Sequence, residues 1–113
     1  MAKLLIHIGT SDRRVVEANA IYYAEAVHAD TLVRQRAAPT TRDVRELGQV
    51  ERAWRRHGFV RIHDNYLVNP DRILRIRKRS ESRDWEVQLT PPVNLVLPVS
   101  RRHLADLWAI FEG

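Results

Sequence analysis

The sequence predicts a mainly β domain with about seven short strands and two helical segments. Short runs of aliphatic, β-branched and aromatic residues recur between clusters of turn-forming residues, a pattern typical of strands. Two other segments space their apolar residues three and four positions apart, as an amphipathic helix does. At 113 residues the chain has room for one modest core, so we expect a single domain over residues 1–113 without a separate catalytic or sensory unit.

Two pairs of strands are expected in the first third of the chain. The turn cluster from Gly9 to Asp12 separates the first pair, and the segment 28–30 separates the second. The expected strands are Leu4–Ile8, Arg13–Glu17, Ala20–Ala26 and Thr31–Arg36.

The first helical segment follows a break at residues 37–41. Thr40 or Thr41 can cap a helix whose first turn carries Asp43, where a carboxylate interacts favourably with the helix dipole. Gly48 interrupts the pattern, so the segment could also form two short helices. The apolar residues close to one helical face are Val44, Leu47, Val50 and Trp54.

The second half of the chain predicts further strands and a closing helix. Asn69-Pro70-Asp71, the polar segment 80–84 and Pro91-Pro92 all interrupt regular structure. The expected strands are Phe59–His63, Arg72–Arg79, Trp85–Thr90 and Asn94–Val99.

The closing helix is expected to pack on the sheet. Ser100 can cap its N-terminus, and apolar residues then follow at helical spacing, so their side chains should be buried. These residues are Leu104, Leu107, Trp108 and Phe111.

The charge balance favours a phosphate-bearing partner. Nineteen basic residues face fourteen acidic ones, for a net charge of +5, and seventeen of the nineteen are arginine. Arginine binds a phosphate or a guanine edge through two parallel hydrogen bonds. A genome rich in G and C would also enrich arginine, but it does not explain where these charges lie.

Several classes of protein are disfavoured. No apolar run approaches the roughly 20 residues that cross a bilayer, and the N-terminus lacks a secretion signal, so we expect a cytoplasmic protein with no membrane partner. The chain has no cysteine, and its five histidines lack the spacing of a zinc site. With no glycine-rich phosphate loop and no nucleophile–base arrangement, we expect no cofactor, no metal and no enzymatic activity.

Two motifs carry a resemblance to a known family. Residues 59–72 read Phe-Val-Arg-Ile-His-Asp-Asn-Tyr-Leu-Val-Asn-Pro-Asp-Arg before Ile73, and residues 97–102 read Leu-Pro-Val-Ser-Arg-Arg. Together they resemble the signature of the LytTR family, the output domains of bacterial response regulators. Residues 20–26 and 30–33 are similar to its first two central strands. The resemblance implies small, largely antiparallel sheets with short flanking helices, and double-stranded DNA binding that regulates transcription.

The resemblance also implies which segments reach successive major grooves of DNA. They are a loop between two central strands, the segment after the motif histidine, and the turn that enters the last helix. In this sequence they carry His28, Asp30 and Thr31; Asp64 and Asn65; and Ser100, Arg101 and Arg102. Two cations at a helix start oppose the dipole by about 0.3–1 kcal/mol each, which favours a bound anion there, whereas the alternative is a solvated pair offset by a carboxylate.

Other basic and polar residues have weaker assignments. Arg75, Arg77 and Arg79 alternate along one strand face, where they could follow phosphates or form a solvated face or guarded edge. His63 is expected to bond the backbone near Tyr66, as a packing residue.

Asp64 departs from the family pattern, in which a basic or amide side chain is common. A carboxylate near phosphates is repelled unless it accepts a hydrogen bond from cytosine or pairs with an arginine. The alternative function is therefore a protein-interaction module on the same fold with weakened DNA binding. An RNA-binding β domain is disfavoured because the strands lack an evident aromatic stacking platform. Further partners compatible with the resemblance are a receiver domain, in cis or in trans, and a second copy bound at paired DNA repeats.

Overall fold

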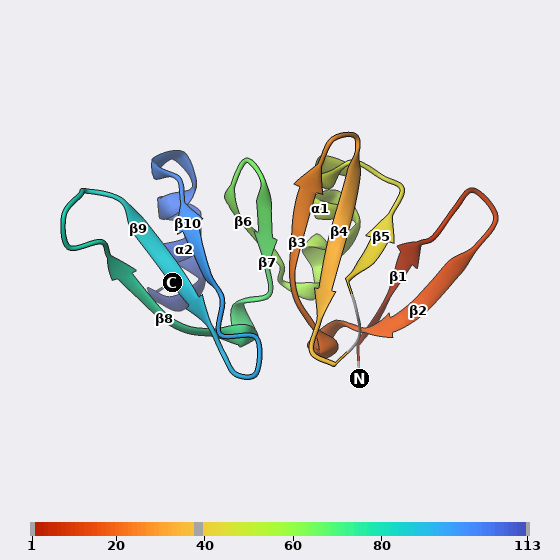
Figure 1. Cartoon of the computed structure of the whole chain (residues 1–113), viewed down its shortest axis with the longest axis horizontal. Coiled ribbons are helices and arrows are strands. Elements are labelled where there is room, and N and C mark those ends of the chain that lie inside the picture. The colour runs from red at the N-terminus through yellow and green to blue at the C-terminus, as the bar shows by residue number, and fades with distance from the viewer. Residues whose placement is uncertain (1, 38–39, 113) are drawn as a thin grey trace.

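The computed structural model describes residues 2–37 and 40–112, which form an elongated body of 46 × 27 × 26 Å. Three small antiparallel sheets lie side by side along the long axis (Figure 1). The strands are β1 Lys3–His7, β2 Arg13–Glu17, β3 Ile21–Val27, β4 Asp30–Gln35, β5 Thr41–Asp43, β6 Val60–His63, β7 Tyr66–Val68, β8 Ile73–Lys78, β9 Trp85–Leu89 and β10 Val96–Val99. The helices are α1 Leu47–Trp54 and α2 Arg101–Glu112, with 3₁₀ turns at Ala18–Ala20, Arg55–His57 and Pro70–Arg72.

The central sheet has the order β5-β4-β3-β7-β6, and every neighbouring pair is antiparallel. A separate hairpin, β1–β2, stands at one end of this sheet. The third sheet, β10-β9-β8, stands at the other end, with α2 beside it. This arrangement confirms the expected mainly β architecture of small antiparallel sheets with short helices.

The interior consists of two clusters of buried side chains. One gathers apolar residues of β1, β2, α1 and the central sheet around Trp54, which is 1% exposed. The other gathers residues of β3, β6, β7, β9, β10 and α2 around Tyr22 and Leu107, both fully buried. Because β3 contributes to both clusters, packing joins the two halves of the molecule.

The first helix begins later than the sequence suggests. Residues 41–43 form strand β5, and α1 starts at Leu47 with Glu46 at its N-cap. Asp43 therefore lies on a strand, and Val44 is 41% exposed instead of lying on the helix face. Gly48 does not interrupt α1, which ends at Trp54 before a 3₁₀ turn. Ala38 and Pro39, part of the expected break, lie outside the described residues.

Strand β7 was not expected, because Tyr66–Val68 is too short to show a period. The closing helix is present, but only part of its expected apolar face is buried. Leu107 is fully buried and Trp108 is half-buried against Trp85, whereas Phe111 is 51% exposed. The expected burial of Phe111 is wrong, because this residue lies on the last turn of α2. In the described residues no helix is long and apolar enough to cross a membrane.

Candidate nucleic-acid interface

Three turns lie along one edge of the molecule, at the top of Figure 1. They are the β3–β4 turn, the β6–β7 turn and the entry to α2, and we call this edge the turn edge. Backbone hydrogen bonds fix their relative positions. The N–H of Ala26 donates to the Asn65 carbonyl at 2.9 Å, which ties the first turn to the second. The N–H of Ser100 donates to the Ile62 carbonyl at 2.8 Å, which ties the third turn to the second. Segments distant in sequence thus form one continuous row.

The β3–β4 turn presents an exposed histidine and a paired carboxylate. His28 has a φ of 58°, a left-handed conformation that histidine adopts more readily than most residues. Asp30 lies 3.1 Å from the guanidinium of Arg42 on β5. Thr31 is fully buried, and its hydroxyl donates to the Arg45 carbonyl at 2.9 Å. Thr31 is therefore not positioned for direct DNA contact, because its side chain faces the interior and supports the loop before α1.

The β6–β7 turn is braced by its own motif residues. The N–H of Asn65 donates to Nδ1 of His63 at 3.1 Å, which confirms the supporting role expected for this histidine. The guanidinium of Arg61 donates to the carbonyls of His63 and Asp64, at 2.8 and 2.5 Å. Asp64 and Asn65 are left exposed at the tip.

The entry to α2 differs from the expected N-cap. The Ser100 hydroxyl is buried and finds no hydrogen-bond partner among the described residues, so it does not cap the helix. The Ser100 carbonyl instead accepts from the N–H of His103 at 3.1 Å. Arg101 and Arg102 are both exposed at the first turn. The backbone, rather than the serine side chain, therefore positions the two arginines.

The Asp64 carboxylate lies near one arginine and one histidine. Its Oδ1 is 3.6 Å from the guanidinium of Arg102 and 3.6 Å from Nε2 of His103. The 3.6 Å separation from His103 is too long for a hydrogen bond, so this histidine is a neighbour of the carboxylate and not a bonded partner. Both turn-edge carboxylates, Asp30 and Asp64, thus have an arginine beside them, which lowers the local negative potential.

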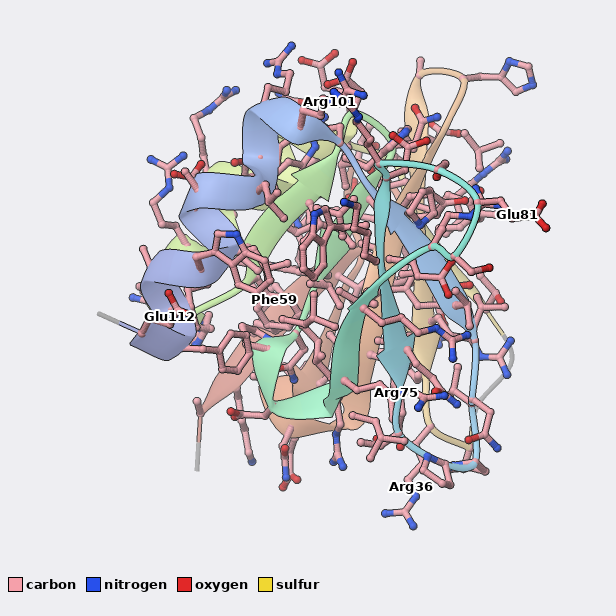
Figure 2. All side chains as sticks on the ribbon, turned by 90° about the vertical axis from the view of Figure 1, so that its left-hand side faces the viewer. Arg36, Phe59, Arg75, Glu81, Arg101 and Glu112 are labelled. Atoms are coloured by element: carbon pink, nitrogen blue, oxygen red, sulfur yellow. The ribbon has the colours of Figure 1, made fainter. Side chains whose placement is uncertain are left out.

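The arginine row of β8 runs over the outer face of the third sheet. Arg75 bonds to Gln88 at 2.9 Å, and Glu86 lies 2.7 Å from Arg77 and 3.6 Å from Arg79. Figure 2 places Arg75 far from Arg101, near the opposite end of the sheet. Glu86 therefore offsets part of the charge of the row, and Arg75 does not belong to the turn edge.

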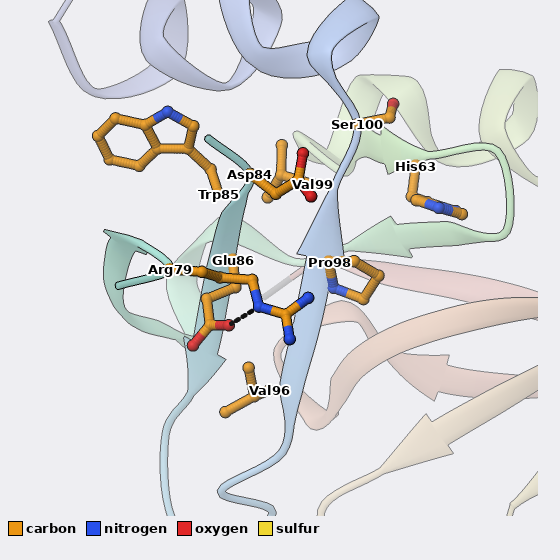
Figure 3. A pocket seen from close by; sticks show the side chains of 9 residues that line it. All are labelled: His63, Arg79, Asp84, Trp85, Glu86, Val96, Pro98, Val99 and Ser100. Atoms are coloured by element: carbon orange, nitrogen blue, oxygen red, sulfur yellow. Dashed lines mark ion pairs between the residues drawn. The ribbon is translucent and has the colours of Figure 1, made fainter. Parts of the chain in front are cut away.

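A cleft of about 440 Å³ separates the end of this row from the turns (Figure 3). Its walls include Arg79, Asp84, Glu86, His63 and Ser100. Charges of both signs line it, so it offers no uniform field for an anion. Among the described residues no group of three His, Cys, Asp or Glu side chains could hold a metal ion.

Two further arginines matter to the turn edge. Arg42 extends from β5 beside the first turn, with 62% of its side chain exposed. Arg61 braces the second turn and also donates to Glu51 of α1 at 2.7 Å. The position of Arg61 within the motif Phe-Val-Arg-Ile-His could have indicated its role from the sequence. No sequence pattern could have indicated Arg42, because its position beside the turn depends on the β4–β5 pairing.

A buried ion pair anchors the segment between β5 and α1. The carboxylate of Asp43 is fully buried and lies 2.8 Å from the Arg45 guanidinium. It also accepts from the backbone N–H groups of His7, at 3.0 Å, and Arg45, at 2.9 Å. Burial alone would raise the pKa of Asp43, but the hydrogen bonds from Arg45 and His7 outweigh it, so the pKa lies below its ordinary value. Asp43 therefore joins the β1–β2 hairpin to the loop that holds Thr31.

The comparisons with known proteins agree with this architecture. The family model of the LytTr DNA-binding domain matches residues 11–112. A solved structure of the LytTr DNA-binding domain of a Bacillus cereus protein superposes with a TM-score of 0.76 at 18% identity, covering 100% of this chain and 99% of that one. Among curated proteins, none matches the chain significantly. A likeness at that identity shows the fold, and the family match extends over nearly all the sequence. The chain belongs to the LytTR family of DNA-binding domains.

Proposed function

We propose that this domain binds double-stranded DNA in a sequence-specific manner and regulates transcription in the bacterial cytoplasm. The observation that carries the proposal is the alignment of three turns on one edge, where arginines from separate elements lie beside every turn (Figure 1). Family membership supports the ligand class. The net charge of +5 supports it further, because neutralised phosphates release counterions.

The order of the turns supports binding across successive major grooves. The three turns follow one another along the long axis of the molecule, so the two outer turns can enter neighbouring grooves of one duplex. In this arrangement Arg101 faces a base edge, and Arg42 and Arg102 face phosphates.

The neighbours of Asp64 bear on the alternative function. A protein-interaction module was considered because the Asp64 carboxylate would repel phosphate. Arg102 lies beside this carboxylate and offsets that repulsion, which favours DNA binding over the alternative. Of the candidate phosphate contacts, we retain Arg79, which directly follows β8, and set Arg75 aside because it lies away from the turn edge. A receiver domain in cis or in trans, and a second copy on paired repeats, remain part of the proposal as regulatory partners.

A binding selection tests this proposal. Duplexes selected from a random pool should yield one enriched sequence, and fluorescence anisotropy should give a dissociation constant at least about a thousandfold below that of a scrambled duplex. Single-stranded DNA and RNA duplexes of the same sequence serve as controls. Equal affinity for the selected and scrambled duplexes would mean that the domain binds DNA without sequence specificity. No binding to any duplex would favour the protein-interaction module.

A further inference from the structure

Strand β2 is an open edge at the end of the molecule farthest from α2 (Figure 1). The N–H of Ala18 donates to Ala2, and the N–H of Ile8 donates to Asp12, at 3.0 and 3.1 Å. Even-numbered residues of β2 therefore direct their backbone groups toward β1. Because this direction alternates along an antiparallel strand, the odd-numbered residues direct theirs away from it. In the described residues no backbone hydrogen bond reaches that outer side of β2.

The side chains along this edge are self-complementary. The odd-numbered residues of β2 are Arg13, Val15 and Glu17, a cation, an apolar group and an anion at equal spacing. Val15 is 61% exposed, and its cross-strand neighbour Leu5 is 42% exposed on the same face. The guanidinium of Arg13 bonds only to carbonyl oxygens within its own turn among the described residues.

From this pattern we propose that β2 pairs with β2 of a second copy, antiparallel and centred on Val15. A two-fold axis then places each Val15 opposite the other and each Arg13 opposite the partner's Glu17. Both charge pairs are attractive, and all three outward residues exchange backbone hydrogen bonds. The two hairpins join into one four-stranded sheet with an apolar row of Leu5 and Val15 from both copies.

The charge pattern identifies a second copy as the occupant. An unrelated strand would need an anion and a cation in this same order, whereas a second copy supplies them by symmetry. One five-residue edge is smaller than the standard interface of about 1,600 Å², so the association is weak. Its formation does not depend on DNA, so failure of one proposal leaves the other standing.

Charge reversal tests the pairing by sedimentation equilibrium without DNA, over protein concentrations up to about 1 mM at ~0.15 M salt. Glu17→Arg sets cation against cation at both ends, and Arg13→Glu sets anion against anion, so each variant alone should lose the dimer. An equimolar mixture of the two should restore it, because every opposed pair becomes attractive. Arg14→Glu is the matched control. It makes the same charge change on the same strand, but opposite the apolar Val16 of the partner, and should keep the dimer.

A cysteine cross-link tests the register. The chain has no cysteine, so Val15→Cys introduces a single thiol. Directly opposed residues in a hydrogen-bonded pair lie about 5.5 Å apart between Cα atoms, within the range of a disulfide. Oxidation should convert Val15→Cys into a covalent dimer, whereas Leu74→Cys, at an apolar position on β8 of comparable exposure, should stay monomeric. A parent protein that is monomeric throughout, a dimer that tolerates both charge reversals, or equal cross-linking of the two cysteine variants would overturn the proposal.

Discussion

Arg101 is the residue on which base preference should depend. It is exposed at the start of α2 and forms no ion pair among the described residues, so its guanidinium is free to bind a guanine edge. Arg101→Ala should weaken binding to the selected duplex by about 1–3 kcal/mol and relax the base preference at one base pair. Anisotropy titrations against selected and scrambled duplexes measure both effects.

Arg75→Ala is the control for this experiment, since Arg75 bonds to Gln88 away from the turn edge. It should change neither affinity. Equal weakening of both duplexes by Arg101→Ala would make Arg101 a phosphate contact, and base preference would then have to arise at His28 or Asp64-Asn65.

Asp64 should lower the general affinity for DNA. The substitution Asp64→Asn removes an exposed anion and frees Arg102, so binding to a scrambled duplex should tighten. The gain should shrink above ~0.15 M salt, because exposed charges are screened there. Circular dichroism should find the fold unchanged. Weaker binding to the selected duplex alone would instead assign Asp64 a base contact through its carboxylate.

Asp43 should make folding stability depend on pH in the acid range. Its folded pKa lies below the unfolded value, so its contribution is complete above about pH 5 and is lost as the pH falls through the folded pKa. Asp43→Asn should cost about 2–4 kcal/mol at pH 7, because Arg45 loses its buried partner. Urea midpoints from pH 7 to pH 3 should converge for the parent and the variant. A constant difference across that range would contradict a charged Asp43.

Among the elements, α2 offers two aromatic side chains with opposite expectations. Trp108 is half-buried and contacts Trp85 edge to face, with 5.0 Å between the ring centroids. Trp108→Ala should therefore lower the free energy of unfolding by about 2–3 kcal/mol, less than the roughly 3–5 kcal/mol of a fully buried aromatic. Phe111→Ala, on the exposed last turn, should stay within about 0.5 kcal/mol of the parent. Denaturant midpoints of both variants give the comparison. Equal losses would mean that the end of α2 packs more tightly than described.

Local pattern predicted the longer elements and failed for the shorter ones. The β1–β2, β3–β4 and β8–β9 hairpins show clear strands around turn clusters, and α2 shows helical spacing. Strands β5 and β7 have three residues each and exist because β4, β3 and β6 bond to them. The start of α1 was misplaced because Asp43 bonds to Arg45 and His7 instead of interacting with a helix dipole.

The sequence predicted where the three turns of the turn edge lie along the chain, but it did not predict which residues they contact. The motifs located the three turns, but Arg42, the burial of Thr31 and the pairing of Asp64 all depend on residues far apart in sequence. Such contacts arise from the tertiary arrangement of the strands and leave no local period.

For the whole molecule, DNA binding should depend steeply on salt. With a net charge of +5 and arginines beside all three turns, the logarithm of affinity should fall linearly with the logarithm of salt concentration, by about 0.9 per phosphate neutralised. Titrations between ~0.05 and ~0.3 M salt give the slope. Arg102→Ala should make this slope shallower by the amount that corresponds to about one phosphate contact. A flat response would contradict an interface built on arginine.

At the turn edge, the residues that face outward are different from those that hold the turns in place, and this separation affects how the domain can change during evolution. Its outward residues, among them His28, Asn65 and Arg101, are exposed, while backbone bonds and buried neighbours hold the turns in place. If these tips contact bases as proposed, a mutation at a tip should alter the DNA sequence that is bound with almost no loss of folding stability. New operators would then be reachable by single substitutions, and the same scaffold could be diversified in the laboratory by randomising these tips alone.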